Sequence, residues 1–115
     1  MNTRRILIAA LAAVPLAAFA HHGWSEYDST QPLKLTGTIE EAGYEHPHGH
    51  IKLKTPSKVW VAVLAPPSRM EARGLSKEML KAGTEVSLEG YPSKAKPEEM
   101  RAERITVAGK TVDLR

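Results

Sequence analysis

Residues 33–40 read Leu-Lys-Leu-Thr-Gly-Thr-Ile-Glu, and this stretch decides the fold class. Apolar or small residues at positions 33, 35, 37 and 39 alternate with polar residues at positions 34, 36, 38 and 40. A period of two places the two sets of side chains on opposite faces of a β-strand, so the pattern predicts a strand with one buried face. Gly37, in the middle of the run, indicates a bend or a bulge in this strand.

Further strand patterns follow along the chain. They lie at residues 51–54, 59–64, 84–91 and 100–107, and a last short strand contains Val112 and Leu114. Residues 59–64 are apolar at every position, which predicts a strand covered on both faces. In residues 100–107 the alternation slips between Ala102 and Ile105, which indicates a second bulge. The expected inward-facing side chains of the second and fourth strands are Ile51, Leu53, Val86 and Leu88.

The segment between the third and fourth strands is helical in pattern. Two prolines followed by Ser68 end the sheet and open a short helix. Ser68 is the expected N-cap, because Glu71 follows at the spacing of a capping box. Ser76 repeats this device before a helical turn that ends at Gly83.

The order strand, strand, strand, helix, strand, strand over residues 32–115 is that of the OB-fold, a Greek-key barrel. We therefore predict a mainly β protein, a small five-stranded OB-like barrel with a short helical segment between strands 3 and 4. A closed barrel leaves few exposed sheet edges, which suits a small domain without a single cysteine. A small β-sandwich, or an open β-meander with a packed helix, is the alternative.

Residues 1–20 have the composition of a secretory signal peptide. Arg4 and Arg5 form the positive end, residues 6–16 are apolar but too short to span a bilayer, and Ala-Phe-Ala at 18–20 is a cleavage box. We expect cleavage after Ala20 and a periplasmic mature protein with no membrane attachment, the alternative being an uncleaved anchor. The predicted organisation is a signal peptide at 1–20, a His-rich leader at 21–31 and the barrel at 32–115.

Charge and residue types exclude several classes of function. The chain has 16 Lys and Arg against 13 Asp and Glu, and two of the basic residues fall in the signal peptide. The mature chain is therefore nearly neutral and has no basic patch, so we expect no nucleic-acid partner. The absence of cysteine excludes disulfides and thiolate sites. No catalytic triad order, phosphate-binding loop or spaced carboxylate pair points to an enzyme, although an oxidative copper site stays open.

All five histidines fall in two clusters. His21 and His22 begin the mature chain, and His46, His48 and His50 lie in the run Glu-His-Pro-His-Gly-His at 45–50. Neutral imidazole suits copper, zinc and nickel. The α-amine and Nδ1 of a first-position histidine can chelate one ion, and a third nitrogen from another histidine completes the copper site called a histidine brace. In the extended run, alternate side chains point the same way, so His48 and His50 can converge on one ion.

These placements predict a periplasmic metal-binding protein for copper handling, with all five histidines as candidate ligands. Cu(II) leads on the Irving–Williams order and zinc is the alternative. An α-amine has a pKa of about 7.7 to 8.0, so a metal can displace its proton near neutral pH. Glu26, Asp28 and Glu45 are weaker candidates, as carboxylate ligands or as acceptors that orient an imidazole.

One joint site faces a geometric objection. The histidine turn lies at the far end of the first strand from Gln31, so the leader must double back along the barrel, or reach the turn of a second subunit in a homodimer. The alternative function is an exported module that binds a small ligand or a protein through a barrel face or the loop 92–99. Its histidines are then incidental, as a polar start and as turn residues.

Three stretches resemble a domain-of-unknown-function family of small exported bacterial proteins: A-H-H-G-W-S-E-Y-D at 20–28, E-H-P-H at 45–48 and G-L-S-K-E-M-L-K-A-G-T-E-V-S-L-E-G-Y-P at 74–92. Members begin with His-His after the signal and carry an Asn-Pro-His turn between the first two strands. His21 and His22 match the opening pair, and His48 matches the turn histidine. His46 stands where the family has Asn, and His50 is an addition. The resemblance implies export and a small barrel-like domain, and no settled activity.

Overall fold

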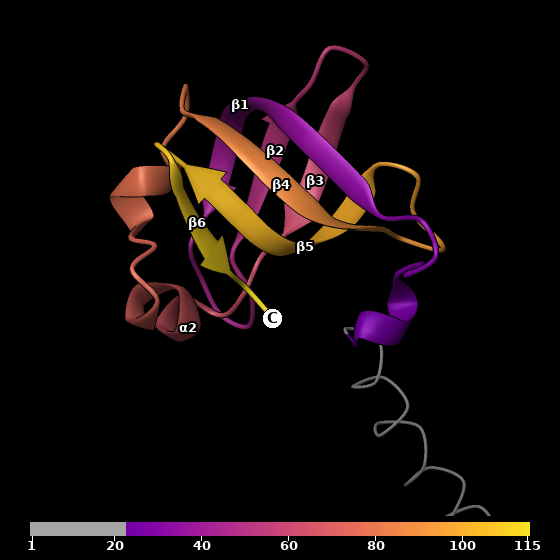
Figure 1. The fold of residues 1–115 in the computed structure, drawn as a ribbon, viewed down its shortest axis with the longest axis horizontal. Helices are drawn as coiled ribbons and strands as arrows, with labels where there is room; N and C mark the ends of the chain where they lie inside the picture. Colours follow the sequence, from indigo (N-terminus) through magenta and orange to yellow (C-terminus); the bar gives the residue numbers. More distant parts are fainter. Residues whose placement is uncertain (1–22) are drawn as a thin grey trace, which may run out of the picture.

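The structure, a computed structural model, describes residues 23–115, so the expected signal peptide and both N-terminal histidines lie outside the described residues. Figure 1 shows a small β-barrel with the helical segment at one end and the leader at the other. Its elements, in chain order, are η2 (Trp24–Glu26), β1 (Leu33–Gly43), β2 (His50–Lys54), β3 (Val59–Val63), α2 (Pro67–Ala72), η3 (Lys77–Leu80), β4 (Glu85–Pro92), β5 (Glu99–Val107) and β6 (Lys110–Asp113).

The strands form one sheet that closes on itself. Their order is β3-β2-β1-β4-β5-β6, with antiparallel neighbours, and an additional parallel pairing joins β3 to β5. In this closing seam, Val63 of β3 pairs with Arg101 of β5. The barrel therefore has five strands, and β6 is an extra strand on β5. The predicted OB-like barrel, with its short helix between strands 3 and 4, is confirmed, and the sandwich and the open meander are excluded.

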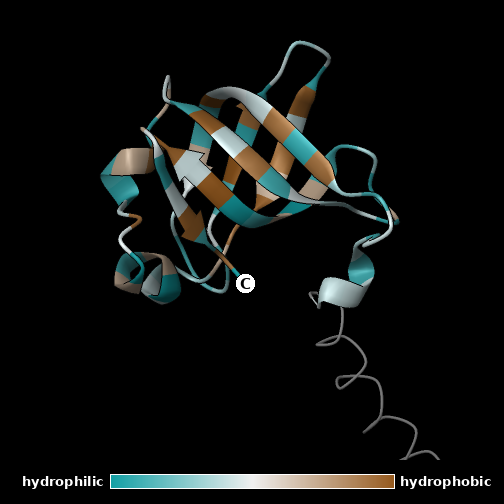
Figure 2. Cartoon of the chain, viewed as in Figure 1, coloured by the Kyte–Doolittle hydropathy of each residue, from teal (hydrophilic) through white to brown (hydrophobic). Residues whose placement is uncertain are grey.

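The core follows the alternation of the sequence. In β2, Ile51 and Leu53 are fully buried and the intervening lysines are exposed, as predicted. Figure 2 shows the same alternation as bands of hydrophobic and hydrophilic residues along the strands. In β3 only one set of side chains is buried, whereas Val59 on the other face is 38% exposed. The prediction of a strand covered on both faces is wrong, because the outer face of β3 borders solvent.

Both bulges exist, but only one lies where the pattern predicts it. The pairing of β4 with β5 shifts between Glu89 and Gly90, which leaves Glu103 as the extra residue of β5 and confirms the predicted slip. In β1 the register shifts between Ile39 and Glu41, not at Gly37. Gly37 instead allows a close approach of strands, because a Cβ there would collide with the carbonyl oxygen of Lys54.

The helical segment begins two residues earlier than the capping-box prediction. Pro66 occupies the N-cap position of α2 and Pro67 is its first residue, so Ser68 is not the cap. Proline suits the first helical position because its φ is already helical and its missing N–H has no partner there anyway. Ser76 does stand at the N-cap of η3, but its side chain makes no capping hydrogen bond. No helix of the described residues is long and apolar enough to cross a membrane.

Candidate functional site

The leader packs against the end of β4 and the loop that follows it. Tyr27 forms an isolated antiparallel bridge with Ser93, and the N–H of Asp28 donates to the carbonyl of Pro92 at 2.9 Å. Tyr27 is only 7% exposed, and its hydroxyl donates to Oε2 of Glu99 at 2.7 Å. Burial and this hydrogen bond to a carboxylate raise the pKa of Tyr27 well above its ordinary value. Residues 23–31 of the leader therefore form part of the barrel surface (Figure 1).

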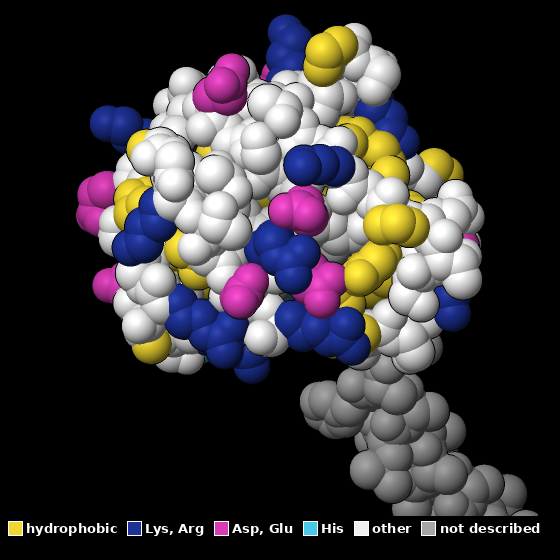
Figure 3. Space-filling model, viewed as in Figure 1, with side chains coloured by type: hydrophobic (Ala, Val, Ile, Leu, Met, Phe, Trp, Pro, Cys, Tyr) yellow, Lys and Arg dark blue, Asp and Glu magenta, His cyan; other side chains and the backbone are white. Residues whose placement is uncertain are grey.

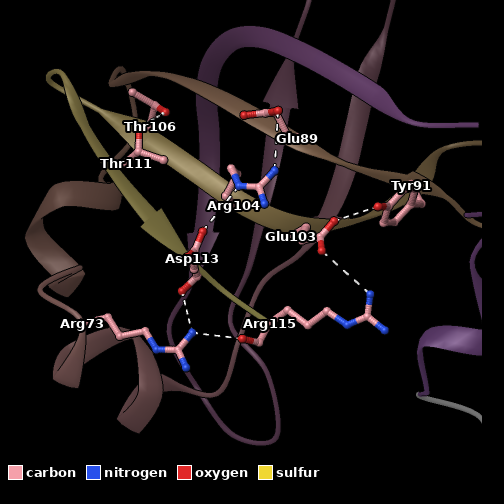
Figure 4. A network of polar contacts seen from close by, with 9 residues as sticks. All are labelled: Arg73, Glu89, Tyr91, Glu103, Arg104, Thr106, Thr111, Asp113 and Arg115. Carbon is pink, nitrogen blue, oxygen red and sulfur yellow. Dashed lines mark hydrogen bonds and ion pairs between the residues drawn. The ribbon is translucent and has the colours of Figure 1, made fainter.

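Trp24 anchors the start of the described leader. The guanidinium carbons of Arg101 and Arg115 each lie 4.4 Å from the centroid of its ring. Such contacts stabilise through the attraction of a cation to the ring's electron density. In Figure 4, Arg115 extends toward Glu103, with which it pairs at 3.8 Å, and the hydroxyl of Tyr91 donates to the same carboxylate at 2.7 Å. Trp24 thus serves to pack the leader against β5 and the C-terminal segment.

His48 lies beside the same guanidinium group. Nη2 of Arg101 is 3.3 Å from Nε2 of His48. The contact follows from the closing seam, because Val63 pairs with His50 on one side and with Arg101 on the other. A guanidinium group can only donate hydrogen bonds, so Nε2 of His48 is the acceptor. The histidine turn and the leader therefore meet at one residue of β5.

Arg101 sits in an unusual electrostatic environment for a cation. Its side chain is buried, with 6% of the residue exposed. Burial lowers the pKa of its guanidinium, the charges of Arg69 and Arg115 act in the same direction, and Tyr27 opposes them. Sequence reasoning missed this residue. The available signal was a charged side chain between Met100 and Ala102, both of which are buried in β5.

A cavity of about 330 Å³, here called the leader pocket, lies between the leader, the histidine turn and the loop after β4. Its lining residues are Glu26, Tyr27, His48, Val63, Ser93, Ala95, Lys96 and Glu99. Glu26 and His48 therefore face the same cavity, and they are the two described residues from the predicted candidates that the structure brings together. The loop 92–99, named in the alternative function, supplies half of the wall.

The remaining turn histidines lie elsewhere. His46 is exposed and is followed by a cis peptide bond to Pro47. The ring of His50 packs so closely over Gly43 of β1 that a Cβ at that position would collide with it. His48 contacts β5 instead, so the two rings are directed at different strands. Within residues 23–115, no three His, Asp or Glu side chains lie together as a group that could hold a metal ion.

The other two carboxylate candidates, Glu45 and Asp28, do not line the leader pocket. Glu45 is exposed in the turn. Asp28 accepts hydrogen bonds from the N–H and hydroxyl of Thr30 and from the amide of Gln31, at 2.6 to 3.0 Å. These bonds lower the pKa of Asp28 and fix the turn that leads into β1. Figure 3 shows acidic and basic side chains interspersed on the face in view, without a broad patch of one charge among the described residues there.

Comparison with known proteins identifies a family and a shared fold. The family described as "Family of unknown function (DUF6152)" matches residues 9–100, most of the chain, and this bears out the resemblance drawn from the sequence. No curated protein matches. Among solved structures, the chain is similar to TiaS in a complex with its tRNA and ATP, at 18% identity, TM-score 0.50 and 77% coverage of this chain. A ZRD-deleted mutant of TiaS in complex with agmatine gives 17% identity, TM-score 0.52 and 76% coverage. The chain spans only 20% and 25% of those two proteins, so the likeness shows the fold alone.

Proposed function

The chain belongs to DUF6152, a family of unknown function, and we propose that it is an exported metal-binding protein that handles copper in the periplasm. Its site combines the amine and ring of His21, the neighbouring His22 and the turn residue His48. The observation that carries the proposal is the meeting of leader and turn at Arg101. This guanidinium lies over the ring of Trp24 and contacts the ring of His48.

Chain length supports a joint site within one molecule. His21 precedes Trp24 by three residues, and three residues of extended chain span at most about 11 Å. Because Trp24 and His48 contact the same guanidinium group, the start of the mature chain is within reach of His48. Trp24 of the leader and His48 of the turn both contact Arg101, which lies in the seam between β3 and β5. A homodimer is therefore not required for the two clusters to share an ion.

The donor set suits a borderline divalent ion. The amine and Nδ1 of His21 close one chelate ring, and His48 supplies a third nitrogen. Three nitrogen donors without a thiolate favour Cu(II), with Zn(II) as the alternative. Glu26 lines the leader pocket with His48 and offers a carboxylate either as a weak ligand or as the acceptor that orients an imidazole. His46 and His50 do not line this pocket and stay secondary candidates.

The proposal is tested by changing the N-terminus and measuring the affinity for Cu(II). The chain that begins at His21 is compared with the same chain extended by Gly-Ser, which moves the amine away from the imidazole. Isothermal titration should show much weaker Cu(II) binding by the extended chain, since it loses the amine–imidazole chelate. Equal affinities would refute the proposed site.

A second candidate function is binding of a small polar ligand in the leader pocket. The loop 92–99 contributes Ser93, Ala95, Lys96 and Glu99 to its wall, and this observation favours the alternative. A metal ion that binds only the native state raises its stability by mass action. A melting temperature unchanged by stoichiometric Cu(II) and Zn(II) would therefore favour the second function over the first.

A further inference from the structure

The contact between Arg101 and His48 bears on how the proposed metal site is regulated. In a neutral imidazole one nitrogen carries a proton and the other carries the lone pair. Because the guanidinium of Arg101 donates to Nε2 of His48 at 3.3 Å, the lone pair is at Nε2 and the proton is at Nδ1. A metal ligand also needs a lone pair. In this tautomer the imidazole of His48 has one available nitrogen lone pair, at Nε2. That lone pair already accepts the hydrogen bond from Arg101.

From this geometry we infer that Arg101 and the metal ion compete for Nε2 of His48, so that metal uptake displaces the guanidinium from the histidine and from the leader. The inference rests on the proposed function and adds a residue that sets the affinity of its site. No covalent or redox step is involved, because one donor–acceptor contact is replaced by another.

Charge favours the displacement. The guanidinium of Arg101 is buried, and Arg115 lies over the same Trp24 ring, so positive charge is already gathered beside His48. A divalent cation at His48 would add to this accumulation of positive charge, and the repulsion falls when the guanidinium moves away. Arg101 therefore lowers the affinity of the empty site for the metal ion. Once the ion is bound, the guanidinium moves away from His48.

The displacement has a structural readout at Trp24. The Arg101 guanidinium lies 4.4 Å from the centroid of the Trp24 ring and 6.0 Å from that of Tyr27. When it leaves, the Trp24 ring loses one of its two cationic neighbours while Arg115 stays in place. The environment of Trp24, and hence its fluorescence, is expected to change as the metal binds. In this way metal binding is coupled to the docking of the leader.

The test measures Zn²⁺ affinity and tryptophan emission of the chain that begins at His21. Zn²⁺ is used because it does not quench fluorescence as Cu²⁺ does. Arg101→Met removes the competitor and keeps an apolar side chain of similar length against Trp24. It should bind Zn²⁺ about tenfold more tightly, a change of about 1.4 kcal/mol, which is near the low end for a hydrogen bond to a charged group. Arg115→Met removes an equal charge from Trp24 without contacting His48 and should alter the affinity less than about twofold.

Emission is followed in a Trp60→Phe background, which leaves Trp24 as the sole tryptophan of the mature chain. The spectrum should shift on saturation with Zn²⁺, and the shift should be absent in Arg101→Met. Zn²⁺ binding with no change at Trp24 and equal affinities of the parent and Arg101→Met would overturn this inference and leave the proposed function standing. Weaker binding by a folded Arg101→Met would also overturn it. No Zn²⁺ or Cu²⁺ binding at all would overturn both. If Arg101→Met does not fold, the emission of the Trp60→Phe chain decides alone.

Discussion

The hydroxyl of Tyr27 donates to Oε2 of Glu99 at 2.7 Å, and this bond ties the leader to the first residue of β5. Glu99 in turn pairs across the closing seam with Val61 of β3. The attachment of the leader and the closure of the barrel therefore share one residue. The leader pocket depends on both, since Tyr27 and Glu99 line it.

Replacing Tyr27 by Phe is expected to lower the free energy of unfolding by about 1 kcal/mol, the usual net worth of a hydrogen bond, and to weaken Cu(II) binding because the leader is less firmly held. Urea denaturation and metal titration measure the two effects. Tyr44→Phe is the matched control, since its hydroxyl donates to the carbonyl of Leu75 away from the leader. It should lose similar stability with unchanged metal affinity, and a loss of affinity in both variants would contradict a specific role for the leader.

Alkaline pH is expected to destabilise the fold through Tyr27. Its pKa is raised in the folded state above the ordinary value of 10.0, mainly by burial and then by Glu99. The folded state thus holds the proton more tightly, and this contribution to stability is complete below the unfolded pKa and is lost as the pH rises above it. The urea midpoint should fall between about pH 9 and pH 11, and Tyr27→Phe should show a smaller fall. An identical pH profile in the variant would contradict this assignment.

Gly90 is expected to tolerate no larger residue. It lies at the β5 bulge, where a Cβ would collide with the carbonyl oxygen of Arg101. Gly90→Ala should therefore force the strands apart and lower the free energy of unfolding by about 2 kcal/mol. Ala108→Gly is the control that exchanges the same two residue types in the other direction. Ala108 has a positive φ of 50°, which glycine adopts without strain. It should leave the melting temperature unchanged or raise it, and a tolerated Gly90→Ala would contradict the close packing.

The sequence predicts the strands well because their alternation is a local property. The alternating exposure of residues 33–40 and the slip between Ala102 and Ile105 both appear in the structure as expected. The displaced bulge of β1 and the absent Ser68 cap show the limit of this reasoning. Several neighbouring residues suit a bulge or a cap equally well when the sequence is considered alone. The position of the bulge depends on how β1 pairs with β2, and the position of the cap depends on where the helix begins.

The contacts at the candidate site were less predictable than the fold. The parallel seam between β3 and β5 joins residues about 40 positions apart in the chain. A local sequence pattern does not predict a pairing between strands so far apart. The geometric objection to a joint site assumes that the leader can reach the histidine turn only by running back along β1. In the closed barrel, Arg101 of the β3–β5 seam contacts both Trp24 of the leader and His48 of the turn. The charged side chain between the core residues Met100 and Ala102 marks Arg101 in the sequence, but its contacts with His48 and Trp24 follow from the closed barrel.

The central claim is that the N-terminal histidine and His48 hold one ion, and Cu(II) stoichiometry and affinity in a double-mutant cycle test it most directly. The chain that begins at His21 should bind one Cu(II). His21→Ala and His48→Ala should each weaken binding strongly, and the double variant should lose far less than the sum of the two losses, because either change already spoils the coordination. His46→Ala, in the exposed part of the turn, is the control and should bind as the parent does. Two ions per chain, or a His48→Ala variant with the affinity of the parent, would contradict the joint site.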